Sequence, residues 1–556
     1  MRIDPQPFES SNSARTKEPR YVVQLLFDVS SPAFTSHAGI ANIPGDVIEQ
    51  TVVRISGTSQ SIRPDEGRST IGGLSIQITD LTDVISATDE IKDQLRTNGQ
   101  GIRGSEVRVF VGYSDDFGAF VRVATQVVRN VSMTAAGSYV IETADVSRDV
   151  RVSVFEPVQT VITASIQAAD TTINVADASD FETVWHVSSF TDAPNQKVGY
   201  FKIEQTGEIV RYTGTTGTSF TGCTRAVFGT GAKAVDFDAT APAERAPKIV
   251  EFIYLEMPAP MLALAVMTGD IYGVSPGETL PAHWHAGIDP AWVDITQHEN
   301  IGADLWDTSD PSGGFIVRFA GLTKTNARTF LEREIHSLIG TFPPIGADGK
   351  VGLRRVNKIL NDAAYVAVLN PGNVISHGSL LHDQTKLFNL FRIDWNYDEV
   401  SSEFTRTTLF TDSTSISQHG ATETKTWQFR GLHGSRHTAA IISERIDTLR
   451  DRYSSPPLII DVRAAPSLNF LEVGDVVFLE LPNVADYTSL NSPPTLARSF
   501  EIQRSSIDWQ SGAVSLQLFA SSVEKTVIPP PQSPGNALSD AWYTSEGLSL
   551  IHISEP

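Results

Sequence analysis

The sequence predicts a mainly β, multidomain protein with a minor α component. Short runs rich in Val, Ile, Thr and aromatic residues recur between Gly and Pro turns, at the roughly 8 to 12 residue spacing of many-stranded proteins. The 556 residues suffice for roughly three or four domains of about 150 residues each. With 40% hydrophobic and 19% charged residues, the composition is globular and excludes general disorder.

The first β region is expected over residues 20–157. It follows a polar, Pro/Ser-rich segment at residues 1–19, which we expect to be flexible and which lacks the apolar stretch of a secretory signal. A short helix is expected at residues 88–96, with Thr88 as its N-cap. The candidate strands are residues 21–27, 51–55, 74–78, 107–113, 120–123, 127–133 and 138–144.

A small β module is expected over residues 158–245, because both of its ends are linker-like. Its short candidate strands end in turn residues and lie within residues 171–175, 207–214 and 220–225. An α/β region then covers residues 246–374. It opens with a broken apolar helix at residues 250–257 and 260–268, and its best helix is at residues 325–338, stopped by Gly340.

A second strand-rich region is expected over residues 375–520. It contains one long helix at residues 437–453, and its candidate strands are residues 388–397, 458–463, 475–480, 500–507 and 514–519. Residues 521–556 form a Pro/Ser-rich linker or tail. Its last ten residues resemble the translation of a sequencing-library adapter, and the alternative is a short apolar terminal strand, so we assign no function to residues 545–556.

Charge, cysteine count and hydropathy argue against nucleic acid as the main partner, an intramolecular disulfide and a membrane-spanning segment. The net charge of −22 argues against nucleic acid or an anionic membrane as the main partner, since both repel it. The single cysteine, Cys223, cannot form an intramolecular disulfide. The most hydrophobic stretch, residues 259–267, is far shorter than the roughly 20 residues that span a bilayer, so no membrane-spanning segment is expected.

The strongest candidate metal ligands are His283 and His285, which flank Trp284. On a strand, residues i and i+2 share a face, so both imidazoles could reach one metal ion. Further candidate ligands follow closely: Asp289, Asp294, His298 and Glu299. No fixed-spacing motif such as H-E-x-x-H accompanies them, and we favour a Pro-flanked loop whose rings pack and hydrogen-bond locally.

No other pattern predicts a catalyst or a cofactor. The two acidic clusters are most simply explained as solvated faces, and they comprise Asp80, Asp83, Asp89 and Glu90, and Asp304, Asp307 and Asp310. Cys223 has no nearby histidine in sequence, so we expect a small packed residue rather than a nucleophile. The Gly-rich segment at residues 229–231 lacks the Gly-Lys-Ser/Thr sequence and the following helix of a phosphate loop. We therefore predict no catalytic residue, no cofactor and no enzymatic activity.

Four local patterns together resemble the tail hub (baseplate hub or tail tip) protein of long-tailed, siphovirus-like bacteriophages. The second of them reads E-I-V-R-Y-T-G followed by T-G-C-T-R, and the fourth reads L-E-V-G-D-V-V-F-L. The patterns lie at residues 57–68, 163–228, 265–306 and 471–479, and the two motifs of the second lie within residues 207–225. The resemblance covers about residues 20–520.

The resemblance implies two hub β-barrels, one at residues 20–157 and one at 375–520, with the 158–245 module projecting from them. Three chains would then form a homotrimeric ring of six barrels in the virion. The implied partners are the distal tail protein, the tape measure protein, and tail tip, fibre or receptor-binding proteins. DNA would pass only in transit through the lumen, which an acidic lining would suit. In such a protein His283 and His285 are structural loop residues.

Two other classes of protein stay open at this stage. One is a β-rich adhesin or carbohydrate-binding protein, for which exposed aromatic residues such as Trp185, Trp284 and Trp292 would be needed. The other is a virion-associated, metal-dependent hydrolase, which would need the histidine and carboxylate groups named above. A glycan array, metal analysis and a peptidoglycan digestion assay separate these classes from the hub.

Overall fold

The computed structural model of the chain confirms a mainly β, multidomain protein with a minor α component. The ranges that the structure describes are residues 19–27, 31–79, 102–134, 138–186, 196–240, 245–272, 277–304, 316–356, 363–398, 402–433, 438–486, 488, 495–509 and 511–522. The expected helix at residues 88–96, the acidic residues around it and the tail beyond residue 522 lie outside them. No helix within these ranges is both long enough and apolar enough to cross a bilayer.

The N-terminal sheet has the strand order β3-β2-β1-β8-β9-β10-β7-β4. Its strands are β1 (Arg20–Leu26), β2 (Ala33–Thr35), β3 (Val47–Ile48), β4 (Val52–Ile55), β7 (Ser75–Thr79), β8 (Glu106–Gly112), β9 (Val121–Met133) and β10 (Ser138–Ala144). The Thr51 N–H donates to the Thr35 carbonyl at 2.9 Å, and the Thr51 carbonyl accepts from the Thr79 N–H at 2.8 Å. Because Thr35 ends β2 and Thr51 precedes β4, these bonds draw opposite sides of the sheet together.

The C-terminal sheet has the order β25-β32-β33-β34-β31-β26, with β27 also on β31. Its strands are β25 (Ala367–Leu369), β26 (Val374–His377), β27 (Leu381–His382), β31 (Leu458–Ala464), β32 (Val476–Ala485), β33 (Thr495–Ile507) and β34 (Val514–Ala520). The outermost strands β25 and β26 are joined by residues 370–373, which span at most about 18 Å. Edges of a flat six-stranded sheet lie about 24 Å apart, so this sheet curls.

The two sheets repeat one topology. The strands β1, β4, β7, β8, β9 and β10 occupy the same relative places, in the same chain order, as β25, β26, β31, β32, β33 and β34. The pairings differ at one place, since β1 and β8 are antiparallel whereas β25 and β32 are parallel. The buried apolar residues of both sheets form one continuous cluster.

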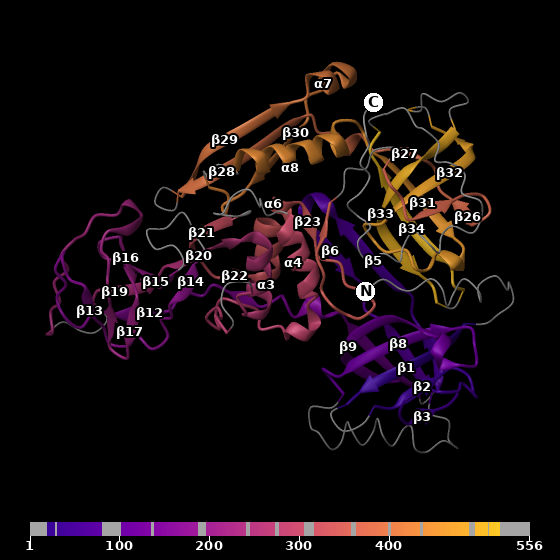
Figure 1. The fold of residues 1–556 in the computed structure, drawn as a ribbon, viewed down its shortest axis with the longest axis horizontal. Helices are drawn as coiled ribbons and strands as arrows, with labels where there is room; N and C mark the ends of the chain where they lie inside the picture. Colours follow the sequence, from indigo (N-terminus) through magenta and orange to yellow (C-terminus); the bar gives the residue numbers. More distant parts are fainter. Residues whose placement is uncertain are drawn as a thin grey trace.

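A hairpin from the N-terminal half belongs to the C-terminal sheet. Strands β5 (Thr58–Arg63) and β6 (Arg68–Ile71) lie between β4 and β7 in the chain, but β5 pairs with β33. Figure 1 shows β5 running between the two sheets, which lie one above the other on the right. The C-terminal sheet therefore draws on residues 58–71 and begins at Ala367, before the predicted start at residue 375.

The small β module has a hydrophobic cluster of its own and lies to the left in Figure 1. Its strands are β12 (Gln159–Val161), β13 (Thr172–Asn174), β14 (Val184–His186), β15 (Gln196–Ile203), β16 (Glu208–Tyr212), β17 (Gly214–Thr216), β18 (Ser219–Thr221) and β19 (Lys248–Glu251). They form one sheet around β15 and a second, three-stranded sheet of β13, β18 and β17.

The central region connects the module to the sheets. It contains β20 (Ile253–Pro258), α3 (Ala259–Thr268), α4 (Ile295–Asp304), β21 (Ile316–Leu322), α5 (Ala327–Phe330), the π-helical turn η7 (Leu331–His336) and α6 (Ser337–Ile339). Short strand pairs join β11 (Ser153–Val154) to β22 (Thr325–Asn326) and β23 (Thr341–Phe342) to β24 (Arg354–Arg355). The helix predicted at residues 325–338 is found as α5, η7 and α6, and Gly340 ends it with φ of 64°.

The helix predicted at residues 250–257 is wrong. These residues belong to strands β19 and β20, and every residue of β20 is buried. A continuous apolar run fits a buried strand as well as a buried helix, and pairing with the distant β21 decides between them. The helix begins only after Pro258, as α3.

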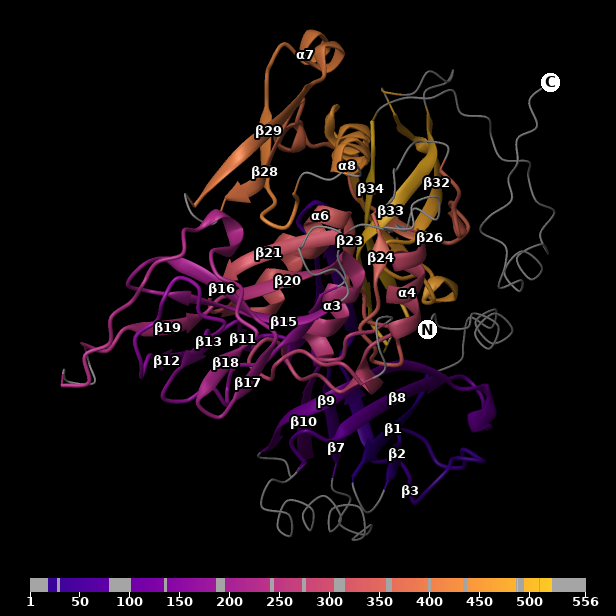
Figure 2. The same ribbon diagram turned by 60° about the vertical axis from the view of Figure 1, so that its left-hand side comes forward.

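The insertion, defined as residues 383–457, separates β27 from β31. It contains β28 (Leu390–Asp398), β29 (Glu403–Thr411), α7 (Ser413–His419), β30 (Thr424–Gln428) and α8 (Thr438–Tyr453). Its three strands have the order β29-β28-β30, and Figure 2 shows them standing above the central region. Ile446 and Leu449 of α8 share a hydrophobic cluster with the central region.

Three buried histidines predict acid sensitivity. Burial lowers the pKa of His186 and of His298 to about 4 and that of His336 to about 3. Below pH 6.5 the unfolded chain therefore binds protons that the folded chain excludes, and stability falls as pH falls. We expect each histidine to cost about 2 kcal/mol between pH 7 and pH 5.

Urea unfolding at pH 7 and pH 5 measures this effect, with His336→Asn as the comparison. The variant should show a smaller difference between the two pH values than the wild type. Equal unfolding free energies at both pH values would contradict the prediction.

Candidate functional site

The β5–β6 hairpin is the feature that joins the two repeated sheets. Residues 58–61 pair antiparallel with residues 504–507 of β33. Gly57, which precedes β5, lies so close that a Cβ there would sit 2.3 Å from the Ile507 carbonyl oxygen. The sequence pattern at residues 57–68 thus coincides with this junction.

The tip of the hairpin is held by the central region. Gly67 has φ of 65°, and a Cβ there would lie 2.6 Å from the Ser337 backbone nitrogen, so only glycine fits this tight contact. Arg68 Nε donates to Glu332 at 2.9 Å, and the Ser69 hydroxyl donates to the Pro343 carbonyl at 2.5 Å. The hairpin is therefore fixed on two sides, by β33 and by η7 and its neighbours.

A buried ion pair ties the insertion to the same strand. Arg452 near the end of α8 donates to Glu501 of β33 at 2.7 and 3.1 Å, and both side chains are 1% exposed. The Arg452 guanidinium also lies over the Phe519 ring. Burial opposes the charge of Arg452, but the neighbouring Glu501 carboxylate outweighs it and raises the pKa of Arg452. This pair fixes α8 on the C-terminal sheet.

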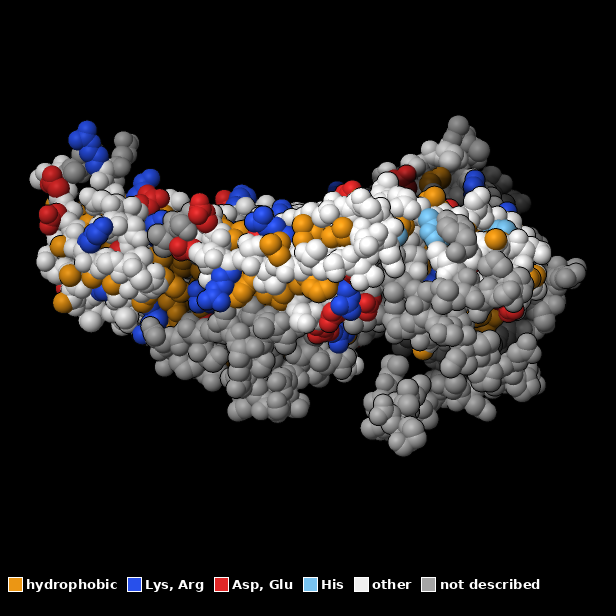
Figure 3. All heavy atoms as spheres, turned by 90° about the horizontal axis from the view of Figure 1, so that it is seen from above, with side chains coloured by type: hydrophobic (Ala, Val, Ile, Leu, Met, Phe, Trp, Pro, Cys, Tyr) orange, Lys and Arg blue, Asp and Glu red, His pale blue; other side chains and the backbone are white. Residues whose placement is uncertain are grey.

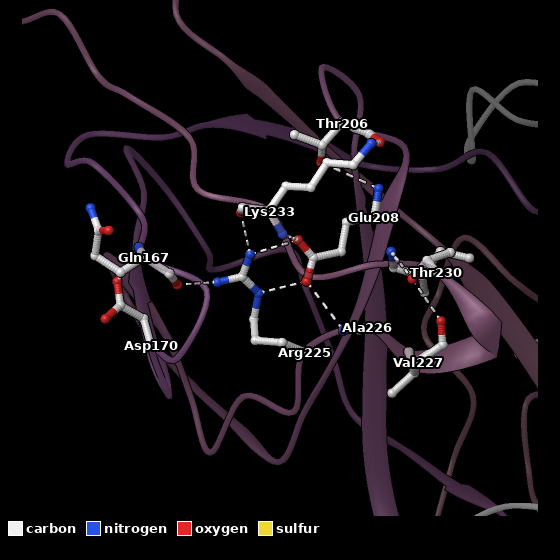
Figure 4. Close-up of polar contacts among 10 residues, drawn as sticks. Gln167, Asp170, Thr206, Glu208, Arg225, Ala226, Val227, Thr230 and Lys233 are labelled. Atoms are coloured by element: carbon white, nitrogen blue, oxygen red, sulfur yellow. Dashed lines mark hydrogen bonds and ion pairs between the residues drawn. The ribbon is translucent and has the colours of Figure 1, made fainter.

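Glu208 begins the E-I-V-R-Y-T-G motif and Arg225 ends the T-G-C-T-R motif of the second sequence pattern, and the two side chains form the polar centre of the small module (Figure 4). Arg225 donates to both Glu208 oxygens, at 2.7 and 2.6 Å, and also to the Gln167 and Lys233 carbonyls. The Glu208 carboxylate further accepts from the N–H groups of Ala226 and Lys233 at 3.1 Å. Burial favours its neutral form, but these donors and the charge of Arg225 lower the pKa of Glu208.

Other residues of the second pattern also have structural roles. The buried Tyr212 hydroxyl donates to the Glu182 carbonyl at 2.8 Å. Gly222 has φ of 59°, and a Cβ there would lie 2.1 Å from Thr213 Oγ1. The pattern therefore encodes a folded β module whose strands are fixed by one ion pair and one tight turn.

The residues His283, Trp284 and His285 lie in a turn, not on a strand. The Trp284 N–H donates to the Pro281 carbonyl, and the ring of His285 packs against Gly269. His283 Nε2 lies 2.8 Å from Glu251 Oε2. Burial opposes protonation of His283, but Glu251 outweighs it and raises the pKa of His283. The argument that both histidines share a strand face therefore fails.

Of the further candidate ligands, Asp289 and Asp294 accept hydrogen bonds at the starts of helices, and His298 and Glu299 lie within α4. Asp289 accepts from the Ala291 N–H and Asp294 from the Gln297 N–H, while His298 Nδ1 lies 3.0 Å from the Asp294 carbonyl. Glu299 lies on α4, exposed. In the part of the chain that the structure describes, no group of three or more His, Cys, Asp or Glu residues is placed to hold a metal ion.

The remaining candidate residues are buried, partly buried or outside the described ranges. Burial raises the pKa of Cys223 to about 12, so it is a packed thiol. Trp284 is buried, and Trp185 and Trp292 are half-buried. Residues 80–101 and 305–315, with six of the seven clustered acids, lie outside the described ranges, as does the side chain of Asp304.

A small pocket lies at the junction itself. It has a volume of about 40 Å³ and is lined by Ser59, Gln60, Ser505 and Glu472, among others. Pockets that bind small molecules usually enclose about 300–1,000 Å³, so this one can hold only water.

Comparisons with known proteins give tail proteins as structural neighbours. No family model matches the chain, and no curated protein does either. A tail protein from Neisseria meningitidis MC58 is 11% identical with a TM-score of 0.34, and the match covers 90% of this chain and 96% of that one. Prophage tail protein gp18 from Listeria monocytogenes EGD-e is 9% identical with a TM-score of 0.38, covering 91% and 95%. The 43 kDa tail protein of prophage MuSo2 from Shewanella oneidensis is 10% identical with a TM-score of 0.33, covering 91% and 98%. Similarity at this level does not assign a family.

Proposed function

We propose that this chain is a structural virion protein, the tail hub at the distal end of a phage tail tube. The observation that carries the proposal is the repeat of one strand topology in two sheets of the same chain. The β5 strand already joins the two repeats side by side. Because each chain carries two equivalent, joined sheets, three copies are enough to form a ring of six sheets. A closed ring also covers strand edges that would otherwise pair with other chains in an uncontrolled way.

The proposal assigns a role to each part of the chain. The N-terminal sheet, within residues 20–157, and the C-terminal sheet, within residues 375–520 together with β25 and the β5–β6 hairpin, act as the two hub barrels. The 158–245 module projects from them, and the 246–374 region supports it. The ring binds the distal tail protein and tape measure protein on one side and the tip, fibre or receptor-binding proteins on the other. DNA passes through its lumen, and no turnover chemistry is needed.

Electron microscopy of particles labelled on this protein tests the proposed location. We expect the label at a single position, at the end of the tail tube remote from the capsid. Label along the whole tube, or on the capsid, would contradict it. Binding of the purified chain on a glycan array would favour the adhesin, and digestion of peptidoglycan would favour the hydrolase. The burial of Trp284 disfavours the adhesin.

A further inference from the structure

The long strands β9 and β33 can be aligned position by position over their second halves. Each has 13 residues, and each carries a bulge against the next strand, at Arg129 in β9 and at Gln503 in β33. Aligning the two bulges places Met133 on Ile507 and Val131 on Ser505. The repeat therefore extends from the strand order to single positions.

The equivalent ends of these strands differ in what covers them. Ile507 pairs with Thr58 of β5 and is only 6% exposed, whereas Met133 is 66% exposed. On the β8 side, the pairing of β9 ends at Val128, which bonds with Gly104 and Ser105. Among the described residues, no strand pairs with that side of residues 130–133. We call these four residues the free edge.

The free edge presents hydrogen-bonding groups outward. The Thr134 N–H donates to the Ser138 carbonyl, so by alternation the backbone groups of Ser132 and Asn130 face β10. Those of Val131 and Met133 then point away from it. The same alternation in β33 turns Ser505 and Ile507 toward β5. The free edge therefore matches the surface that β5 occupies on the other sheet.

In chain order, the insertion occupies the place in the C-terminal repeat that the β5–β6 hairpin occupies in the N-terminal repeat. The hairpin lies between β4 and β7, and the insertion lies between β26/β27 and β31, the equivalent strands of the other sheet. Its outermost strand β29 pairs only with β28 among the described residues and is largely exposed, Leu409 to 61%. Seen from above, hydrophobic side chains lie among charged ones over this part of the molecule (Figure 3).

We propose that β29 of one copy pairs with the free edge at residues 130–133 of the next copy. Within one chain, β5 adds a strand to the edge of β33 by backbone pairing. The proposed contact would add β29 in the same way to the free edge of β9 in the next chain. Within one chain the contact is not made: β29 pairs only with β28 among the described residues, and it lies near the top of Figures 1 and 2 whereas β9 lies in their lower half. This inference rests on the proposed hub function and names the surfaces that close its ring.

Disulfide trapping in assembled particles tests the pairing. The chain has one cysteine, the buried Cys223, so Met133→Cys with Leu409→Cys introduces the only accessible thiols among the described residues. On oxidation with a copper–phenanthroline reagent, we expect covalent dimers and trimers on a non-reducing gel. The matched control pairs Leu409→Cys with Val152→Cys, a residue that is also exposed (41%) and lies off the free edge; it should stay monomeric.

The outcomes separate the inference from the function on which it rests. Three copies per particle without cross-linking of the 133/409 pair, or cross-linking only within one chain, would overturn the edge pairing and leave the hub intact. Six copies or one copy would overturn the hub itself. As a second variant, Leu409→Pro removes an N–H that faces away from β28, so the chain should fold while particle assembly falls about tenfold. Normal assembly of this variant would also overturn the pairing.

Discussion

Replacing Arg225 with methionine is expected to destabilise the small β module by about 3–5 kcal/mol, because it leaves the Glu208 carboxylate buried without its ion-pair partner. The two side chains are 6% and 0% exposed, so water cannot replace the lost donors. Because the module has its own hydrophobic cluster, its unfolding should separate from that of the two sheets. Hydrogen exchange should rise within residues 158–245 and stay unchanged in the sheets.

The control for this variant is Arg211→Met in the same module. Arg211 is half-buried and donates to the Thr224 hydroxyl, so its loss should cost about 1 kcal/mol or less. The pH dependence gives a second check. The pKa of Glu208 is lowered on folding, so the ion pair stabilises the module above the unfolded-state pKa and its contribution is lost as pH falls through the folded pKa. Equal losses for the two variants would contradict the structural role of the ion pair.

Arg452→Met is expected to destabilise the C-terminal sheet and its insertion by about 3–5 kcal/mol, since Glu501 would remain buried and unpaired in β33. Arg450→Met is the matched control, two residues earlier on the same helix. Arg450 is 36% exposed and pairs with Asp447 and Asp451 at the surface, where an ion pair contributes about 1 kcal/mol or less.

Urea unfolding of both arginine variants measures the difference directly. A loss for Arg452→Met no larger than that for Arg450→Met would show that the ion pair does not anchor α8. The double variant Arg452→Met with Glu501→Leu should recover most of the stability, because removing both charges leaves neither one buried and unpaired.

Local patterns in the sequence predict many elements well. The strand predicted at residues 138–144 coincides with β10 (Ser138–Ala144), and the helix predicted at 437–453 agrees with α8 (Thr438–Tyr453). The helix has buried apolar residues at helical spacing (Ile442, Ile446 and Leu449), and the strand is rich in residues that favour strands. The pairing of β5 with β33 could not be predicted in this way. The two strands lie more than 400 residues apart in sequence, and the local sequence of neither strand indicates which strand it pairs with.

In the candidate site, too, local motifs could be predicted from the sequence but contacts between distant residues could not. The second sequence pattern could be recognised, but the ion pair that explains Glu208 and Arg225 becomes visible only when β16 and the turn after β18 come together. The available signal was an acidic residue, Glu208, at the start of the first motif and a basic residue, Arg225, at the end of the second. The metal argument for His283 and His285 depended on a strand, and Pro281 begins a turn there instead.

The number of copies of this chain in an intact tail tests the account most directly. Quantitative mass spectrometry of purified particles, calibrated against a capsid protein of known copy number, gives that number. The ring of repeated sheets predicts three copies per tail. Six copies, or a single copy, would contradict it.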